Sequence, residues 1–334
     1  MFRFLYLQVV NTPIKSIVVM KNHFLVFLFL GFLTQAQQKP IILNEEVTRI
    51  ITELASDKMQ GREIFTPGID SASVFIEKEF TKIGLNYYGD LKNYRQAFEK
   101  NSKMANNVIA IISGKSKANE FVVFSAHFDH LGMKNTGDDT IYNGANDDAS
   151  GVTAVITLAS YFKKLDQNER TLIFVAFTGE EVGGFGSQFF SKSIDADKVI
   201  AMFNIEMIGT LSEWGFDSAY ITGFEKSDFG AILQKNLEGS EFKFYPDPYP
   251  AENLFYRSDN ATLAKIGVPA HTISTSQMNG EPNYHQVTDE VSALKLSNMT
   301  EIIRAIALSS VTIINGTATP SRVKIRFKKY LKQE

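Results

Sequence analysis

Apolar residues recur along the chain in two spacings, which predict helices alternating with strands. Short continuous runs of apolar, β-branched or aromatic residues predict strands, several of them buried on both faces. These runs lie at 108–112, 121–125, 172–177, 199–205, 219–222 and 268–273. Apolar residues at helical spacing predict helices at 43–55, 67–83, 149–164, 227–237, 258–266 and 291–314.

This alternation predicts an α/β fold, a three-layer sandwich whose mixed, mostly parallel central sheet has helices on both faces. Residues 37–320 contain no repeat and no Pro/Gly/Ser-rich linker, so we expect them to form a single domain. In such sheets ligands bind beyond the carboxyl ends of the central strands. Candidate site residues are therefore expected directly after the strands.

The two ends of the chain are expected to lie outside this domain. Lys21, an apolar run at 24–33 and a small residue at Ala36 have the layout of a signal peptide cleaved near Ala36, with Met20 as the functional start. The run of about ten residues is too short to cross a bilayer, which takes about 20, so no permanent membrane anchor is expected. We predict a secreted or periplasmic protein with a leader at 1–36 and a basic, solvated tail at 321–334.

Composition then excludes several classes of function. The formal net charge of −3 gives no electrostatic reason to expect nucleic acid or an anionic membrane as a partner. The chain has no cysteine, which excludes disulfides, thiolate metal sites and a cysteine nucleophile. Any zinc must therefore be held by His, Asp and Glu side chains.

The first candidate residues follow the strand predicted at 121–125. His127 and Asp129 stand at its end, although a lone histidine is more often a hydrogen-bonded structural residue. In the turn that precedes the next helix, Asp148 or Ser150 fits a helix cap. Asp147 stays available to project both carboxylate oxygens into a cleft.

Further carboxylates and a second imidazole follow the later strands. Glu180 and Glu181 are adjacent at the end of the strand at 172–177, where a divalent cation would relieve their repulsion. Glu206 ends another apolar run, and a buried unpaired glutamate would be costly. His285 precedes the last helix. Together these segments form an oxygen and nitrogen ligand set that suits zinc.

The order and spacing of these segments resemble the M28 family of zinc peptidases, which includes bacterial leucyl-type aminopeptidases. The flanking patterns at 59–62, 106–109, 257–259 and 267–269 are also similar, and the resemblance covers most of the chain after residue 45. It implies a zinc-dependent exopeptidase of aminopeptidase type. Its substrates would be peptides with a free N-terminus, and two Zn²⁺ ions per chain are expected.

The resemblance also implies which residues hold the metal. One zinc would be held by His127, Asp147 and Glu206, and the other by Asp147, Glu181 and His285. Asp147 would therefore bridge the two ions. The family more often has Asp where this chain has Glu206, and the extra methylene shifts the carboxylate of the metal site beside His127 by roughly a bond length.

Other residues receive roles from the same resemblance. Glu180 would be the general base, and Asp129 would hydrogen-bond the outer nitrogen of His127. Tyr284 either donates a hydrogen bond to the oxyanion or packs beside His285. Arg257 would lie near the pocket for the substrate's α-amine.

Three further residues complete the comparison with the family pattern. Asn260 stands where the family often has histidine. For His130 and His271 we favour structural roles, although His130 is near enough to the ligands to support them.

Two alternatives belong to other classes of function. A glutaminyl cyclase-like enzyme on the same fold typically keeps one zinc and lacks a ligand equivalent to His127, so the presence of His127 argues against it. A non-catalytic binding domain usually loses metal ligands, and here none is lost outright.

Overall fold

The central strands of the sheet are those that the continuous apolar runs predict. In the computed structural model, which describes residues 41–324, four parallel strands lie side by side in the order β5-β4-β6-β9. Their bounds are Lys117–His127 for β4, Arg170–Phe177 for β5, Val199–Ile205 for β6 and Ala270–Ser274 for β9. Every residue of β5 and β9 is buried, as expected for strands covered on both faces.

Antiparallel pairs extend the sheet on both sides, which makes it the mixed sheet that we predicted. On one side β3 (Lys103–Ile112) pairs with β5, and on the other β7 (Ser218–Ile221) pairs with β9. The outer strands are β1 (Asn86–Tyr87) and β2 (Arg95–Lys100), which pair with β3, and β8 (Lys243–Pro246), which runs parallel to β7.

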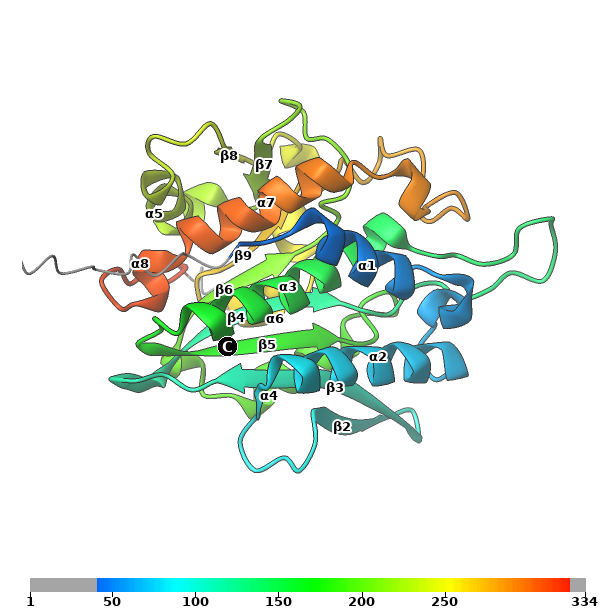
Figure 1. Ribbon diagram of the computed structural model, residues 1–334, viewed down its shortest axis with the longest axis horizontal. Coiled ribbons are helices and arrows are strands. Elements are labelled where there is room, and N and C mark those ends of the chain that lie inside the picture. Colours follow the sequence, from blue (N-terminus) through cyan, green and yellow to red (C-terminus); the bar gives the residue numbers. More distant parts are fainter. Residues whose placement is uncertain (1–40, 325–334) are drawn as a thin grey trace, which may run out of the picture. The chain divides into compact units, whose positions relative to one another are not determined.

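Helices cover both faces of the sheet, and Figure 1 shows the two outer layers. One layer contains α1 (Asn44–Leu54), α2 (Pro67–Ile83), α3 (Ser150–Leu165) and α7 (Leu296–Ser309). The opposite layer contains α4 (Phe185–Ser193) and α6 (Asn260–Ala264). α5 (Phe229–Asn236) and the short α8 (Val311–Ile314) pack beside α7. The predicted three-layer α/β fold is confirmed.

One predicted helix has the wrong bounds. The apolar pattern at 291–314 predicts one helix, but the chain is extended at Leu294, and α7 begins only at Leu296. The backbone N–H of Lys295 donates to the carbonyl of Gly209, which holds this segment against the loop after β6. A helical backbone could not make that contact, so the helix starts after it.

Two predicted segments at the chain ends lie outside the described residues: the leader at 1–36 and most of the basic tail at 321–334. The described residues belong to one compact unit. None of the helices within residues 41–324 combines the length and apolar character needed to cross a membrane.

Candidate metal centre

Asp147 lies between two histidines and offers one carboxylate oxygen to each. Its Oδ1 is 3.2 Å from His127 Nε2, and its Oδ2 is 3.3 Å from His285 Nε2. His127 ends β4, whereas His285 comes from the loop before α7. The fold therefore brings together three residues that are far apart in the sequence, with Asp147 in the position of a bridging group.

Glu181 completes the cluster and brings in a histidine for which a structural role was favoured. Its Oε2 lies 3.1 Å from His285 Nε2, and its Oε1 lies 2.8 Å from His130 Nδ1. Ligand atoms of His127, Asp147 and Glu181 all lie within 4.8 Å of one another. His130 is fully buried, and through its hydrogen bond it holds the carboxylate of Glu181 in place.

Several polar atoms of the cluster have no hydrogen-bond partner among the described residues. His127 Nδ1 lies 3.1 Å from the main-chain oxygen of Asp129, to which it can donate. Its Nε2 lies 3.2 Å from Asp147 Oδ1. Asp147 Oδ2, His130 Nε2 and His285 Nε2 are buried without a hydrogen-bond partner among the described residues. A bound cation would satisfy such a set of atoms.

Glu206 lies at the edge of this group. It directly follows β6 and is buried, with Oε2 3.5 Å from Asn204 Nδ2. Burial raises the pKa of Glu206 to about 7. Within the described chain it is not a member of the compact group that His127, Asp147 and Glu181 form.

Asp129 contacts the cluster in a different way from the one expected. Its carboxylate lies 3.8 Å from His127 Nδ1 and instead accepts the backbone N–H groups of Glu180 and Glu181, at 3.1 and 3.3 Å. The main-chain oxygen, not the carboxylate, is therefore the hydrogen-bond acceptor for His127. Asp129 fixes the turn that carries both glutamates.

The loop that carries Asp147 is held by two other aspartates. The Asp148 carboxylate accepts the N–H groups of Gly151 and Met207, each at 3.0 Å, so it ties the start of α3 to the end of β6. Asp289 accepts the N–H groups of Asn146 and Asp147, at 2.8 and 3.0 Å. Sequence reasoning missed Asp289, whose only signal is its position four residues after His285.

Arg62 was also missed as a supporting residue, although the pattern at 59–62 was noted. It is completely buried and donates to the main-chain oxygens of Phe128, Asn143 and Gly144, at 2.8, 2.5 and 2.9 Å. Gly61 before it has φ +66°, and a Cβ there would meet a main-chain oxygen at 2.0 Å. This close approach lets one arginine brace the loops on both sides of the cluster.

Burial and neighbouring charged groups shift the pKa values of several residues in and beside the cluster. Burial opposes protonation of His127, but its contact with Asp147 raises the pKa of the imidazole well above its usual value. Contacts with Asp147 and Glu181 raise the pKa of His285 to about 10. Burial raises the pKa of Glu180 well above its usual value. The carboxylates of the site thus favour positively charged groups beside them, such as a protonated histidine or a cation.

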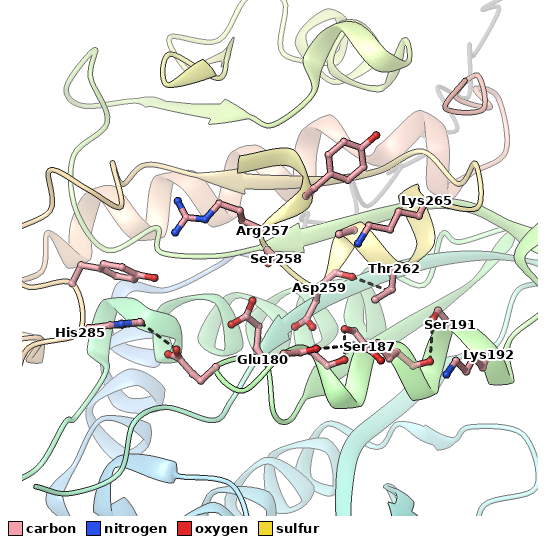
Figure 2. Close-up of a pocket in the computed structure, with 17 residues that line it drawn as sticks. Glu180, Ser187, Ser191, Lys192, Arg257, Ser258, Asp259, Thr262, Lys265 and His285 are labelled. Carbon is pink, nitrogen blue, oxygen red and sulfur yellow. Dashed lines mark hydrogen bonds and ion pairs between the residues drawn. The ribbon is translucent and has the colours of Figure 1, made fainter. Parts of the chain in front are cut away.

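A cleft of about 580 Å³ opens beside the cluster and is lined by Glu180, Glu181, Arg257, Tyr284 and His285. Figure 2 shows Glu180 and His285 at one end of this cleft. The Tyr284 ring stacks on His285 with centroids 3.9 Å apart, and burial raises the pKa of its hydroxyl, which therefore stays protonated. Among the described residues, the one ion pair of Arg257 is a long contact of 3.9 Å with Glu252.

His271 and Asn260 serve the fold rather than the cluster. His271 is bound between the Thr222 carbonyl and the Ser227 hydroxyl, at 2.8 and 2.7 Å. The Asn260 amide donates to the main-chain oxygens of Phe255 and Ala270, at 3.0 and 3.1 Å. The structural role favoured for His271 is confirmed by these contacts.

Comparison with known proteins identifies the family. The model of peptidase family M28 matches residues 107–310, which is more than half of the chain and includes every candidate metal ligand. The chain belongs to peptidase family M28. A probable zinc metalloprotease of Pyrenophora teres f. teres (strain 0-1) is 28% identical over 50% of this M28 chain and 36% of its own length. The chain thus spans about a third of the length of that relative.

Solved structures share the fold of this M28 chain at low identity. A zinc aminopeptidase from Bacillus subtilis has a TM-score of 0.66 and 14% identity, covering 86% of this chain and 98% of its own. A glutaminyl cyclase from Bacteroides thetaiotaomicron has a TM-score of 0.60 and 15% identity, covering 81% and 98%. Because both enzymes share the fold, the fold alone does not choose between their reactions.

Proposed function

We propose that this M28 protein is a zinc-dependent aminopeptidase that removes N-terminal residues from peptides. The observation that carries the proposal is that the metal cluster closes one end of a cleft in which further carboxylates surround Glu180. Such a cleft suits a peptide whose free α-ammonium enters first. The apolar run at 24–33 supports export by a signal peptide, which N-terminal sequencing of the exported protein would test.

The spacing of the donor atoms supports zinc. Two ligand atoms at about 2.0–2.2 Å from a tetrahedral zinc ion lie about 3.3–3.6 Å apart. The contacts of Asp147 with the two histidines, 3.2 and 3.3 Å, are close to this separation. His127, Asp147 and Glu206 would hold one ion, and Asp147, Glu181 and His285 the other. When bound there, zinc supplies the Lewis acidity that activates water and polarises the scissile carbonyl.

Glu180 is the residue that moves the proton. It is adjacent in sequence to Glu181, forms no ion pair with a histidine within the described structure, and its side chain lines the cleft. It accepts a proton from the attacking water and returns it to the leaving amine. The raised pKa of Glu180 suits a group that both accepts and donates a proton near neutral pH.

Several residues around the cleft position the substrate. Tyr284 keeps its proton and lines the cleft beside His285, so its hydroxyl can donate to the developing oxyanion. The substrate's α-ammonium meets the carboxylates of Glu180 and Glu206. Arg257 also lines the cleft, and its positive charge would disfavour an ammonium placed beside it.

A pair of substrates tests which end of the peptide is recognised. Acetylation of an aminoacyl-p-nitroanilide removes the positive charge and the donors that the cleft carboxylates require, which commonly costs several kcal/mol. We expect the free substrate to be cleaved with a kcat/KM at least about a thousandfold higher, or about 4 kcal/mol. Comparable cleavage of the two would refute aminopeptidase action but leave a metallohydrolase. Cyclisation of an N-terminal glutamine without hydrolysis would indicate the cyclase reaction.

A further inference from the structure

The cleft extends away from the metal cluster between helices α4 and α6. Ser187, Ser191 and Lys192 of α4 line one wall, and Thr262 and Lys265 line the other. Figure 2 shows Glu180 and His285 at one end and Ser191, Lys192 and Lys265 toward the other. A substrate whose amine lies beside Glu180 would therefore extend its remaining groups along this polar channel.

The walls of the channel do not suit an aliphatic side chain. Among the described residues that line the cleft, Ala261 is the only aliphatic one, and the aromatic ones are Tyr256 and Tyr284. Burial of a leucine-sized side chain against apolar atoms contributes about 1.5–3 kcal/mol. Most of the other lining residues present hydroxyl, amide or charged groups, so the cleft offers a leucine side chain little aliphatic surface.

Charge changes sign along the cleft. Its inner end has the carboxylates of Glu180, Glu181 and Asp259, and Asp259 is buried with neither oxygen hydrogen-bonded to a described residue. The outer part has the exposed ammonium groups of Lys192 and Lys265. Neither lysine forms an ion pair within the part of the chain that the structure describes. The two cations are therefore free to meet an anion in the cleft.

We propose that the cleft selects substrates that carry a carboxylate at a distance from their free amine, and that Lys192 and Lys265 bind this carboxylate. The inference rests on the proposed aminopeptidase function, because the amine at the inner end sets the direction of the substrate. Two sources supply the same chemistry: the side chain of an N-terminal aspartate or glutamate, and the C-terminal carboxylate of a dipeptide. Long lysine side chains from opposite walls can reach either one.

Glutamyl- and glutaminyl-p-nitroanilide test the side-chain source, because they differ in charge at nearly constant shape. We expect a kcat/KM for the glutamyl substrate about tenfold above that for the glutaminyl substrate, expressed mainly in KM, and falling with added salt. In the Lys192→Gln/Lys265→Gln double variant this ratio should fall to about one, and Lys→Arg replacements should restore it. Lys235→Gln, on the exposed side of α5 and outside the cleft, should keep the wild-type ratio.

Leucyl-alanine and leucyl-alanine amide test the second source. A preference for the free acid that disappears in the double variant would assign the lysines to the C-terminal carboxylate. The proposal would be overturned if two kcat/KM ratios of the wild type were both near one: glutamyl over glutaminyl substrate, and free acid over amide. If N-acetylated substrates were cleaved as fast as the free ones, aminopeptidase action would be refuted. The glutamyl/glutaminyl and acid/amide ratios could still be measured and would still test the role of the two lysines. Calorimetric binding of free glutamate against glutamine gives the same comparison without turnover.

Discussion

Two adjacent glutamates of this chain have different surroundings, which suggests different chemical roles. Glu181 contacts His130 and His285 at 2.8 and 3.1 Å, and its side chain is only 8% exposed. Glu180 lines the open cleft, and the carboxylate of Asp129 holds the backbone of both residues. One turn thus directs one carboxylate into the cluster and the other toward the substrate.

Replacing each glutamate by glutamine should separate these roles. Glu180→Gln should keep nearly normal metal content but lower kcat by at least about a hundredfold, because the proton acceptor is lost. Glu181→Gln should lose metal, since a neutral amide is a weaker ligand than a carboxylate. Elemental analysis and steady-state kinetics of both variants provide the measurement. The opposite pattern in the two proteins would show that the assignment is reversed.

His271 should make stability depend on pH in a defined window. Burial lowers the pKa of His271 to about 4, below its ordinary value of 6.5. As pH falls from 6.5 to about 4, the unfolded chain takes up a proton that the folded protein does not, so this contribution to stability is lost at up to about 1.4 kcal/mol per pH unit.

Urea unfolding of wild type and His271→Gln at several pH values measures this effect. At pH 7 the variant should be less stable, because the contacts with Thr222 and Ser227 are lost. The difference in unfolding free energy should narrow toward pH 5. Ser227→Ala keeps the titrating ring and should follow the wild-type pH dependence. A difference that stays constant with pH would mean that His271 titrates normally in the fold.

Site residues that act through their own side chains could be predicted from the sequence, whereas residues that act through main-chain atoms could not. His127 and Glu181 follow predicted strands, whereas Asp147 and His285 precede predicted helices. All four carry their chemistry in their side chains, so their meeting could be expected. Arg62 acts through main-chain oxygens of distant loops, which no local pattern reveals. The contact of Asp129 with His127 differed from the expected one for a similar reason. The geometry of the turn decides whether the main-chain oxygen or the carboxylate of Asp129 reaches His127.

At the scale of elements, burial on two faces made the central strands predictable. The runs at 172–177 and 199–205 agree with β5 and β6 within two residues. β2 was missed because it alternates buried and exposed residues beside the antiparallel edge, and so lacks a continuous apolar run. α4 was missed because Gly183 and Gly184 precede it and favour a loop, whereas in the structure the α4 backbone begins directly after them.

The contact between Asp289 and the Asp147 loop should control metal affinity from outside the ligand set. Asp289→Asn can accept only one of the two N–H groups that the carboxylate accepts, which leaves a buried donor unpaired at a cost of about 1–3 kcal/mol. We expect zinc affinity to fall about 10- to 100-fold in a competition titration with a chelator. Glu290→Gln, an exposed neighbour with the same loss of charge, should bind zinc normally.

At the scale of the whole molecule, the fold gathers carboxylates where they repel one another. Asp129, Asp147, Asp148, Glu206 and Asp259 are all buried around the carboxyl ends of β4, β5 and β6. Burial raises the pKa of Asp129 to about 6 and raises that of Asp259. Without a cation, the repulsion between these buried carboxylates lowers the free energy of unfolding.

Removal of zinc should therefore destabilise the folded protein as well as stop catalysis. A ligand present at a thousand times its Kd stabilises the folded state by roughly 4 kcal/mol, which corresponds to about 10 °C in Tm for a domain of this size. We expect a chelator to lower Tm by about this amount, and zinc to restore it with close to two ions bound per chain. Binding that saturates at one ion would show that the site of His127 and Glu206 is not filled, and Glu206→Asp should then raise its occupancy. If Tm and stoichiometry were the same in Glu181→Gln as in wild type, the stabilising zinc would have to lie elsewhere than at the Asp147 cluster.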